Sequence, residues 1–66
     1  MSWFKEDDVL TYRETGFILR VLPKENGFEW EVNTSNDENL DLGDADTEDV
    51  AKLIAEAKMD EIRETM

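Results

Sequence analysis

Two alternating apolar runs joined by a glycine-containing turn occupy residues 9–22, VLTYRETGFILRVL. Alternation of apolar and polar residues with a period of two is typical of half-buried β-strands. A two-residue turn at Thr15-Gly16 supplies a glycine that tolerates positive φ. The stretch therefore predicts an antiparallel hairpin with strands at about 9–13 and 17–22.

A third alternating run, FEWEVN at residues 28–33, extends this hairpin into a meander. Two connections to it are compatible with the sequence. A tight turn at Asn26-Gly27 would place Pro23 inside the paired second strand, where proline cannot donate a ladder hydrogen bond. A four-residue loop at 23–26 avoids this conflict, and it is the connection that we predict.

The glycine turn and the four-residue loop fix the predicted pairing of side chains. Leu19 lies between Tyr12 and Trp30 on one face, and Arg20 lies opposite Glu29 as an ion pair on the other face. The predicted core face contains Leu10, Tyr12, Phe17, Leu19, Val21, Phe28, Trp30 and Val32. A face this apolar needs a second layer to cover it.

The C-terminal part of the chain supplies that cover. Asp46 or Thr47 is a favourable N-cap, and the acids that follow suit the positive end of a helix dipole. Apolar residues then recur at helical spacing in a stripe about 100° wide. The stripe consists of Val50, Leu53, Ile54 and Ala57, flanked by Ala51 and Ala55 and widened by Ile62. We predict an amphipathic helix from about 48 to 63 whose stripe packs on the sheet.

The predicted fold class is α+β, with a three-stranded antiparallel meander covered by the C-terminal helix in one domain spanning residues 1–66. Residues 34–46 are polar and acidic and predict a loop. Leu40 and Leu42 alternate with acids inside this loop. They either form a fourth strand or anchor the loop to the core.

The acidic loop also has a spacing that is typical of calcium ligands. Asp37, Asn39 and Asp41 are spaced like ligands one, three and five of an EF-hand loop, and Glu48 falls at position twelve. Gly43, however, stands at position seven rather than six, and a strand rather than a helix precedes the loop. We therefore predict a solvated acidic loop with no metal and no cofactor.

Charge limits the functions open to this chain. Seven basic and eighteen acidic residues give a net charge of −11. This charge repels phosphate backbones and anionic lipid, so we expect no direct binding of nucleic acid or membrane. Cysteine and histidine are absent and so short a chain offers little volume for a substrate pocket, so we expect no enzyme. No stretch has the pattern of a signal peptide or a membrane span, which predicts a cytoplasmic protein.

Three large apolar residues fall on the outer face of the predicted sheet, away from the helix: Val9, Ile18 and Leu22. They form a contact patch or a homodimer surface, or they are ordinary scattered surface residues. Trp3 and Phe4 likewise leave two interpretations open. They either close the edge of the core or stand exposed as partner contacts.

The run FEWEV at residues 28–32 within a strand meander, followed by TEDVA at residues 47–51 at the start of a helix, resembles small phage- and prophage-encoded proteins. The resemblance covers most of the chain. Acidic members of that group mimic DNA and inhibit host nucleases, restriction complexes or CRISPR effectors. The resemblance implies a similar inhibitory role in a host cytoplasm, and it transfers no individual site residue.

We therefore expect a non-enzymatic regulatory or inhibitory protein that binds a basic surface of a host protein. The acids expected to make this contact crowd in the loop and on the helix: Asp37, Glu38, Asp41, Asp44, Asp46, Asp49 and Glu56. The alternative is a structural or assembly module that self-associates through the outer sheet face. In that case the acidity serves solubility.

The excess of acids predicts how stability depends on pH and salt. Like charges repel more strongly in the compact state than in the expanded chain, so the folded state takes up protons more readily and stability falls as pH rises. We expect a higher melting temperature near pH 5 than near pH 8, and a smaller difference in moderate salt, which screens the repulsion. Thermal denaturation at both pH values checks this. Greater stability near pH 8 in low salt would mean that ion pairing or bound cations dominate.

Overall fold

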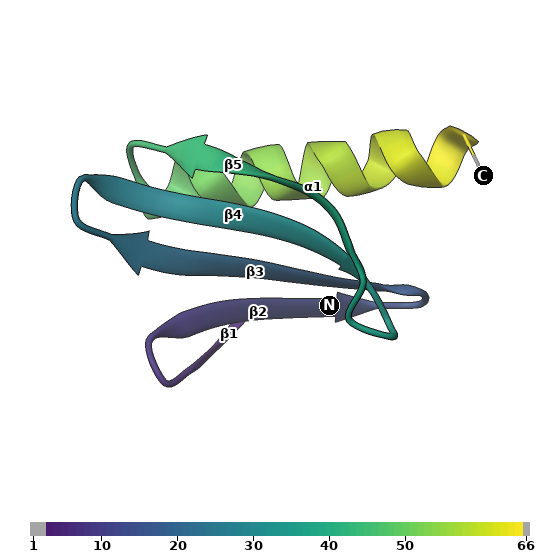
Figure 1. The fold of residues 1–66 in the computed structure, drawn as a ribbon, viewed down its shortest axis with the longest axis horizontal. Helices are drawn as coiled ribbons and strands as arrows, with labels where there is room; N and C mark the ends of the chain where they lie inside the picture. The colour runs from purple at the N-terminus through teal and green to yellow at the C-terminus, as the bar shows by residue number, and fades with distance from the viewer. Residues whose placement is uncertain (1–2, 66) are drawn as a thin grey trace.

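Within residues 3–65, which a computed structural model describes, five strands form one antiparallel sheet whose spatial order follows the chain. The strands are β1 (Phe4–Glu6), β2 (Val9–Glu14), β3 (Phe17–Lys24), β4 (Gly27–Thr34) and β5 (Asn39–Ala45). Helix α1 (Glu48–Thr65) lies along one face of the sheet (Figure 1). The α+β class and the C-terminal helix are confirmed, whereas the sheet has more strands than the three or four predicted.

The strand that sequence analysis missed altogether is β1. It pairs with β2 through a two-residue turn at Asp7-Asp8, where φ is 52° and 67°. Aspartate is one of the few residues that adopt this left-handed conformation readily, and two such residues in succession suit a tight hairpin turn. The two acids therefore form a turn as well as adding charge.

Most of the predicted acidic loop is strand β5. Only residues 35–38 connect β4 to β5, so the loop prediction for residues 34–46 is wrong over 39–45. The fourth-strand interpretation of Leu40 and Leu42 is the correct one. Neither leucine anchors the core, because their side chains are 40% and 54% exposed.

The pairing of β2 with β3 agrees with the prediction and sets Tyr12 opposite Leu19. The pairing of β3 with β4 does not agree. The connecting turn consists of two residues, Glu25-Asn26, and sets Leu19 opposite Val32 rather than Trp30. The predicted register is therefore wrong by two residues. A shift of two leaves every side chain on its own face, so the predicted core face survives the error.

Pro23 lies inside β3, opposite Phe28. The predicted four-residue loop would have kept this proline out of the paired strand. Ladder hydrogen bonds alternate along an antiparallel pair, and the pair that closes a two-residue turn, here Lys24 with Gly27, is hydrogen-bonded. The nitrogen of Pro23 consequently points away from β4. The pairing of β2 with β3 ends at Val21, so that side is open and the missing N–H costs no ladder bond.

The buried core lies between the sheet and α1. In the described part of the chain it consists of Leu10, Phe17, Leu19, Val21, Trp30, Val32, Ala51, Ala55 and Met59. Trp30 packs across the neighbouring strand at Gly43, its register partner. A Cβ on Gly43 would lie 2.5 Å from Cζ2 of Trp30, so the indole fills the space that a side chain there would need.

Helix α1 is rotated about its axis relative to the prediction. The side chains that it buries are Ala51, Ala55 and Met59, whereas Ile54 and Ile62 are only partly buried. Three members of the predicted core stripe are exposed instead: Val50 by 43%, Leu53 by 67%, and Ala57. Large side chains of the sheet fill most of the core layer, so the helix fits best with its small alanines inward. The prediction that Val50, Leu53 and Ala57 pack on the sheet is wrong.

The two aromatic residues before the first hairpin separate onto opposite faces. Trp3 closes the edge of the core, with its ring centroid 5.4 Å from that of Tyr12 and its Nε1 donating a hydrogen bond to Glu56 Oε2 at 2.9 Å. Phe4 is 41% exposed on the outer face, where the guanidinium of Arg13 lies 5.8 Å from its ring centroid.

The rotation of α1 makes a prediction for two large apolar residues of one helix. Met59→Ala should lower the free energy of unfolding by about 2–5 kcal/mol, because Met59 is 3% exposed. Leu53→Ala should change it by less than about 0.5 kcal/mol, because Leu53 is mostly in solvent. Urea denaturation of both variants measures the difference. The reverse order would show that the predicted stripe packs on the sheet after all.

Candidate functional site

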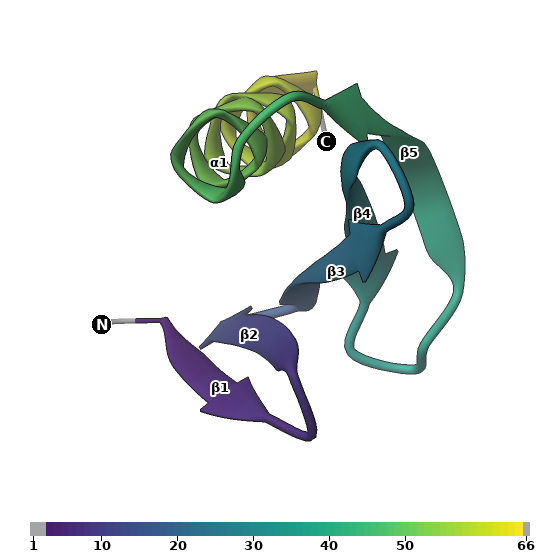
Figure 2. The same ribbon diagram turned by 90° about the vertical axis from the view of Figure 1, so that its left-hand side faces the viewer.

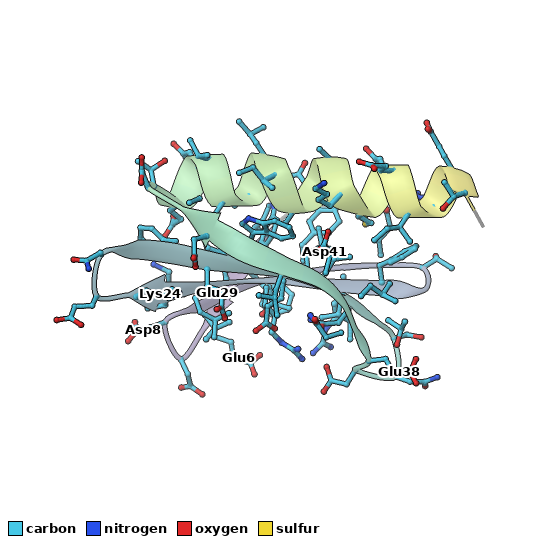
Figure 3. All side chains as sticks on the ribbon, turned by 45° about the horizontal axis from the view of Figure 1, so that its top comes forward. Glu6, Asp8, Lys24, Glu29, Glu38 and Asp41 are labelled. Atoms are coloured by element: carbon cyan, nitrogen blue, oxygen red, sulfur yellow. The ribbon has the colours of Figure 1, made fainter. Side chains whose placement is uncertain are left out.

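The seven acids expected to bind a partner do not form one cluster. Asp37 and Glu38 precede β5, whereas Asp46 and Asp49 follow it, and a strand of this length spans roughly 20 Å. Glu38 lies at the opposite end of the sheet from Lys24, which marks the end where α1 begins (Figure 3). The structure therefore divides the expected site into two ends of the sheet and a separate position on α1.

The loop end is used for holding the chain together. Asp37 Oδ1 accepts a hydrogen bond from Arg20 Nη1 of β3 at 2.9 Å. Thr34 Oγ1 accepts hydrogen bonds from the backbone N–H groups of Asn36 and Glu38, at 3.2 and 3.1 Å. This end of the expected site is a short, internally bonded turn on the outer side of the sheet.

Asp44 lies on the outer sheet face and forms an ion pair with Lys24 of β3, whose Nζ is 2.7 Å from Asp44 Oδ1 and 3.8 Å from Glu29 Oε1. The hydrogen bond to Asp44 raises the pKa of Lys24 above its ordinary value. A depression of about 440 Å³ opens beside this pair, with Phe28 and Asp46 among its lining residues. The ion pair holds the β3–β4 turn against the end of β5.

Asp41 protects the open edge of the sheet. Along each strand, successive backbone N–H groups point alternately to the two neighbouring strands. In the observed register the N–H groups of Asp41 and Gly43 point toward β4, so the N–H of Leu42 points away from the sheet. Asp41 Oδ1 accepts a hydrogen bond from that N–H at 2.9 Å. An unpaired edge invites another strand to add, and an inward-facing charged residue on the edge opposes this. Asp41 therefore has a structural use that the sequence did not reveal.

Glu56 lies on the side of α1 nearest the first hairpin, two turns after Asp49 and one turn before Asp60 along the helix. It accepts the hydrogen bond from Trp3 Nε1, and on the same side of the helix Glu48 lies 3.9 Å from Lys5 Nζ. Arg63, two turns further along, forms an ion pair with Glu14 of β2. These contacts fasten the first hairpin to α1, so Glu56 belongs to the support of the fold.

The outward side of α1 carries an apolar patch that sequence analysis had assigned to the core. This helix patch consists of Val50, Leu53 and Ala57, which lie three and four residues apart and so share one side of the helix. Leu53 has the largest exposed fraction among the exposed large apolar side chains of the described residues, 67%. A second apolar stripe runs along the helix at a spacing of four residues, through Ala51, Ala55 and Met59. This stripe is the sequence signal that could have revealed which side of the helix is buried.

Exposed acids surround the helix patch. Asp49 precedes Leu53 by one turn, Asp60 and Glu64 follow Ala57 by one and two turns, and Asp46 lies just before the helix. The bases on α1 are engaged with acids of the same helix, as Lys52 is with Asp49 at 3.6 Å and Lys58 with Glu61 at 3.9 Å. We call these four acids the acidic rim. Two of them, Asp46 and Asp49, belong to the set expected from the sequence.

Two side chains, Tyr12 and Lys24, have pKa values that the fold shifts away from neutral pH. Burial raises the pKa of Tyr12 above its ordinary value, and the neighbouring carboxylate of Glu14 adds to the effect. Together with the raised pKa of Lys24, this leaves both groups protonated at neutral pH. Across residues 3–65 no three carboxylates gather to hold a metal ion. The calcium-like spacing is broken because Asp41 lies within a strand and Asp37 binds Arg20.

Comparison with known proteins gave no match: no family model, no curated protein and no solved structure resembles this chain significantly. In the part of the chain that the structure describes, no helix combines the length and apolar character needed to cross a membrane.

The edge cap makes a prediction about aggregation. Asp41→Val should increase aggregation several-fold, because it frees the Leu42 N–H and removes the inward charge from the open edge. Glu38→Val removes an equal charge just before the same strand and leaves the cap intact, so it should stay near the wild-type rate. Thioflavin T fluorescence and light scattering measure both. Equal aggregation of the two variants would show that net charge, rather than the cap, protects the edge.

Proposed function

We propose that this protein is a non-enzymatic regulatory or inhibitory protein that binds a basic surface of a host protein through the outward side of α1. The observation that carries the proposal is the exposure of Leu53 inside the acidic rim. An apolar centre surrounded by polar groups is the usual anatomy of a protein interface. A large apolar side chain with two-thirds of its surface in water is a candidate anchor for such a contact.

The distribution of charge supports a basic partner. Six of the seven bases lie within ion-pair distance of an acid: Lys5, Arg20, Lys24, Lys52, Lys58 and Arg63. The net charge of −11 therefore comes from acids in excess of these pairs. Such a field accelerates the approach of a basic surface and opposes contact with phosphate or anionic lipid.

The kind of partner follows from the same chemistry. A basic surface on a host protein commonly serves nucleic acid, and a compact body with a large negative charge competes for it. The resemblance of the sequence to small acidic phage-encoded proteins supports this inhibitory, DNA-mimicking role. The absence of cysteine and histidine from the sequence favours binding over catalysis.

The proposal narrows the set of acids that sequence analysis expected. Asp46 and Asp49 remain, and Asp60 and Glu64 join them as the acidic rim. Asp37, Glu38 and Asp44 lie on or beside the outer side of the sheet, Asp41 caps the edge, and Glu56 supports Trp3. These five acids contribute to the overall field, and the contact itself is assigned to the helix patch and its acidic rim.

A charge-matched pair of variants tests the proposal. The double variant Asp46→Asn/Asp49→Asn removes two charges from the acidic rim, and Asp7→Asn/Asp8→Asn removes two from the β1–β2 turn, where asparagine also tolerates the left-handed conformation. Host lysate is passed over each immobilised protein, and the retained partner is identified and its affinity then measured. We expect a basic partner that the wild type and the turn variant hold equally.

The rim variant should bind that partner at least about tenfold more weakly, and added salt should weaken all three complexes. Leu53→Ser should weaken binding about tenfold or more with an unchanged salt dependence, because it removes the apolar anchor and no charge. Equal weakening by the rim and turn variants would assign binding to net charge alone. A partner that Leu53→Ser and the rim variant both hold as the wild type does would contradict the proposed surface.

A further inference from the structure

The face of the sheet turned away from α1 is uncovered (Figure 2). One row of register partners crosses it from edge to edge, running through Phe4, Thr11, Arg20, Glu31 and Leu42. The two ends of this row are apolar and exposed, 41% for Phe4 and 54% for Leu42. The row therefore presents one apolar group on each edge strand, with polar groups between them.

The residues that the sequence assigned to this face do lie there. Val9, Ile18 and Leu22 alternate with the inward residues of β2 and β3, and each is partly buried. Two of them, Val9 and Leu22, line a shallow hollow of about 250 Å³ together with Arg13 and Arg20. They supply an apolar floor, while Phe4 and Leu42 are the apolar groups that project.

This face carries the smaller part of the net charge of a strongly acidic protein. By strand alternation its charged side chains are Arg13, Arg20, Lys24, Glu6, Glu29, Glu31 and Asp44, and Asp37 reaches Arg20 from the adjoining loop. With Asp7, which lines the hollow, and Glu38 beside the same face, these three bases and seven acids give a net charge of −4. The other four bases and eleven acids of the chain carry −7. A second acidic molecule meets the least repulsion here.

The charges on this face are also separated by strand. All three of its bases lie on β2 and β3, and three of its acids, Glu29, Glu31 and Asp44, lie on β4 and β5. In a two-fold dimer each strand of this face meets a different strand of the second copy, and the contact is favourable when one of the two carries bases and the other carries acids. Bases on β2 and β3 and acids on β4 and β5 meet this condition.

We propose that the outer sheet face binds a second copy of this chain in a two-fold, face-to-face dimer. Turning one copy by 180° about an axis parallel to β3 sets β1 against β5 of the second copy and β2 against its β4. Phe4 then meets Leu42 of the second copy, and Arg13 comes within side-chain reach of Glu31 of the second copy. Each contact occurs twice, and aligned sheets pack in this way in β-sandwiches.

The other surfaces fit a second copy less well. The open edge of β5 is capped at Leu42 by Asp41. The helix patch would bring two acidic rims together, and at close range such like-charge contacts are strongly unfavourable. The dimer leaves the helix patch of each copy exposed. It therefore does not depend on the proposed function, and a dimer would present two helix patches to a basic partner.

The size of the face sets the strength expected of the dimer. Five strands about 4.8 Å apart and about 20 Å long cover roughly 500 Å² per copy, below the ~800 Å² per partner of a standard stable interface. The association should therefore be weak and concentration-dependent. Because each copy carries most of its negative charge elsewhere, added salt should strengthen the dimer, whereas it should weaken binding to a basic partner.

Sedimentation equilibrium of the intact chain over roughly 5–500 µM, in low and moderate salt, tests the proposal. We expect a monomer–dimer equilibrium that tightens with salt. Leu42→Ser should weaken it at least about tenfold, and Glu25→Lys, a charge change in the β3–β4 turn outside the interface, should leave it unchanged or slightly tighter. Circular dichroism confirms that each variant is folded.

A charge exchange makes the test specific to the arrangement. Arg13→Glu and Glu31→Lys should each lose self-association, because each sets like charges against one another twice. An equimolar mixture should recover the dimer, because both contacts then join opposite charges. A chain that stays monomeric at every concentration and salt, a dimer indifferent to Leu42→Ser, or failure of the mixture to recover association would each overturn the proposal.

Discussion

The packing of Trp30 constrains the rest of this structure. Its indole lies across β5 at a position where a Cβ would approach Cζ2 to 2.5 Å, so only glycine fits at residue 43. The same aromatic side chain belongs to the core that α1 covers, and there the helix contributes Ala51, Ala55 and Met59. The bulky indole is thus matched by glycine on the neighbouring strand, and the helix adds two alanines and a methionine to the same core, as a densely packed interior requires.

The rotation of α1 follows from this match and determines what the molecule shows to its surroundings. With the alanines inward, Leu53 and Val50 are left in water among acids. The flank of the helix between this side and the buried alanines binds Trp3 and the first hairpin through Glu56, Glu48 and Arg63. The molecule consequently has two uncovered surfaces of different chemistry: an acidic helix patch, and an outer sheet face that holds three of the chain's seven bases among its acids. One suits a basic partner and the other suits a second copy.

The features that depend on local pattern could be predicted from the sequence. The first hairpin, the identity of the core face in β2–β4 and the start of the helix follow from alternation, turn glycine and the capping residue Thr47, whose hydroxyl accepts the N–H of Val50 at 3.2 Å. The core-face prediction is correct despite an error of two residues in register, because a shift of two residues leaves each side chain on the same face of the sheet. These signals lie within a few residues of one another.

The features that depend on distant parts of the chain could not be predicted. Pro23 is tolerated in β3 because β2 has already ended beside it, which no local pattern shows. The helix rotation depends on side-chain volumes in the sheet, whereas an apolar stripe reports only hydrophobicity. The expected binding acids were dispersed for the same reason, since Asp37, Asp41 and Glu56 each bind a group whose position the fold alone determines.

Contacts between methyl and aromatic protons test the rotation of α1 most directly. In a NOESY spectrum of the methyl-labelled protein, the methyl groups of Ala51, Ala55 and Met59 should show cross-peaks to core side chains of the sheet, because all three are buried in one cluster with them. The methyl groups of Leu53 should show none. Cross-peaks from Leu53 to the sheet, with the alanine methyl groups free of them, would contradict the account.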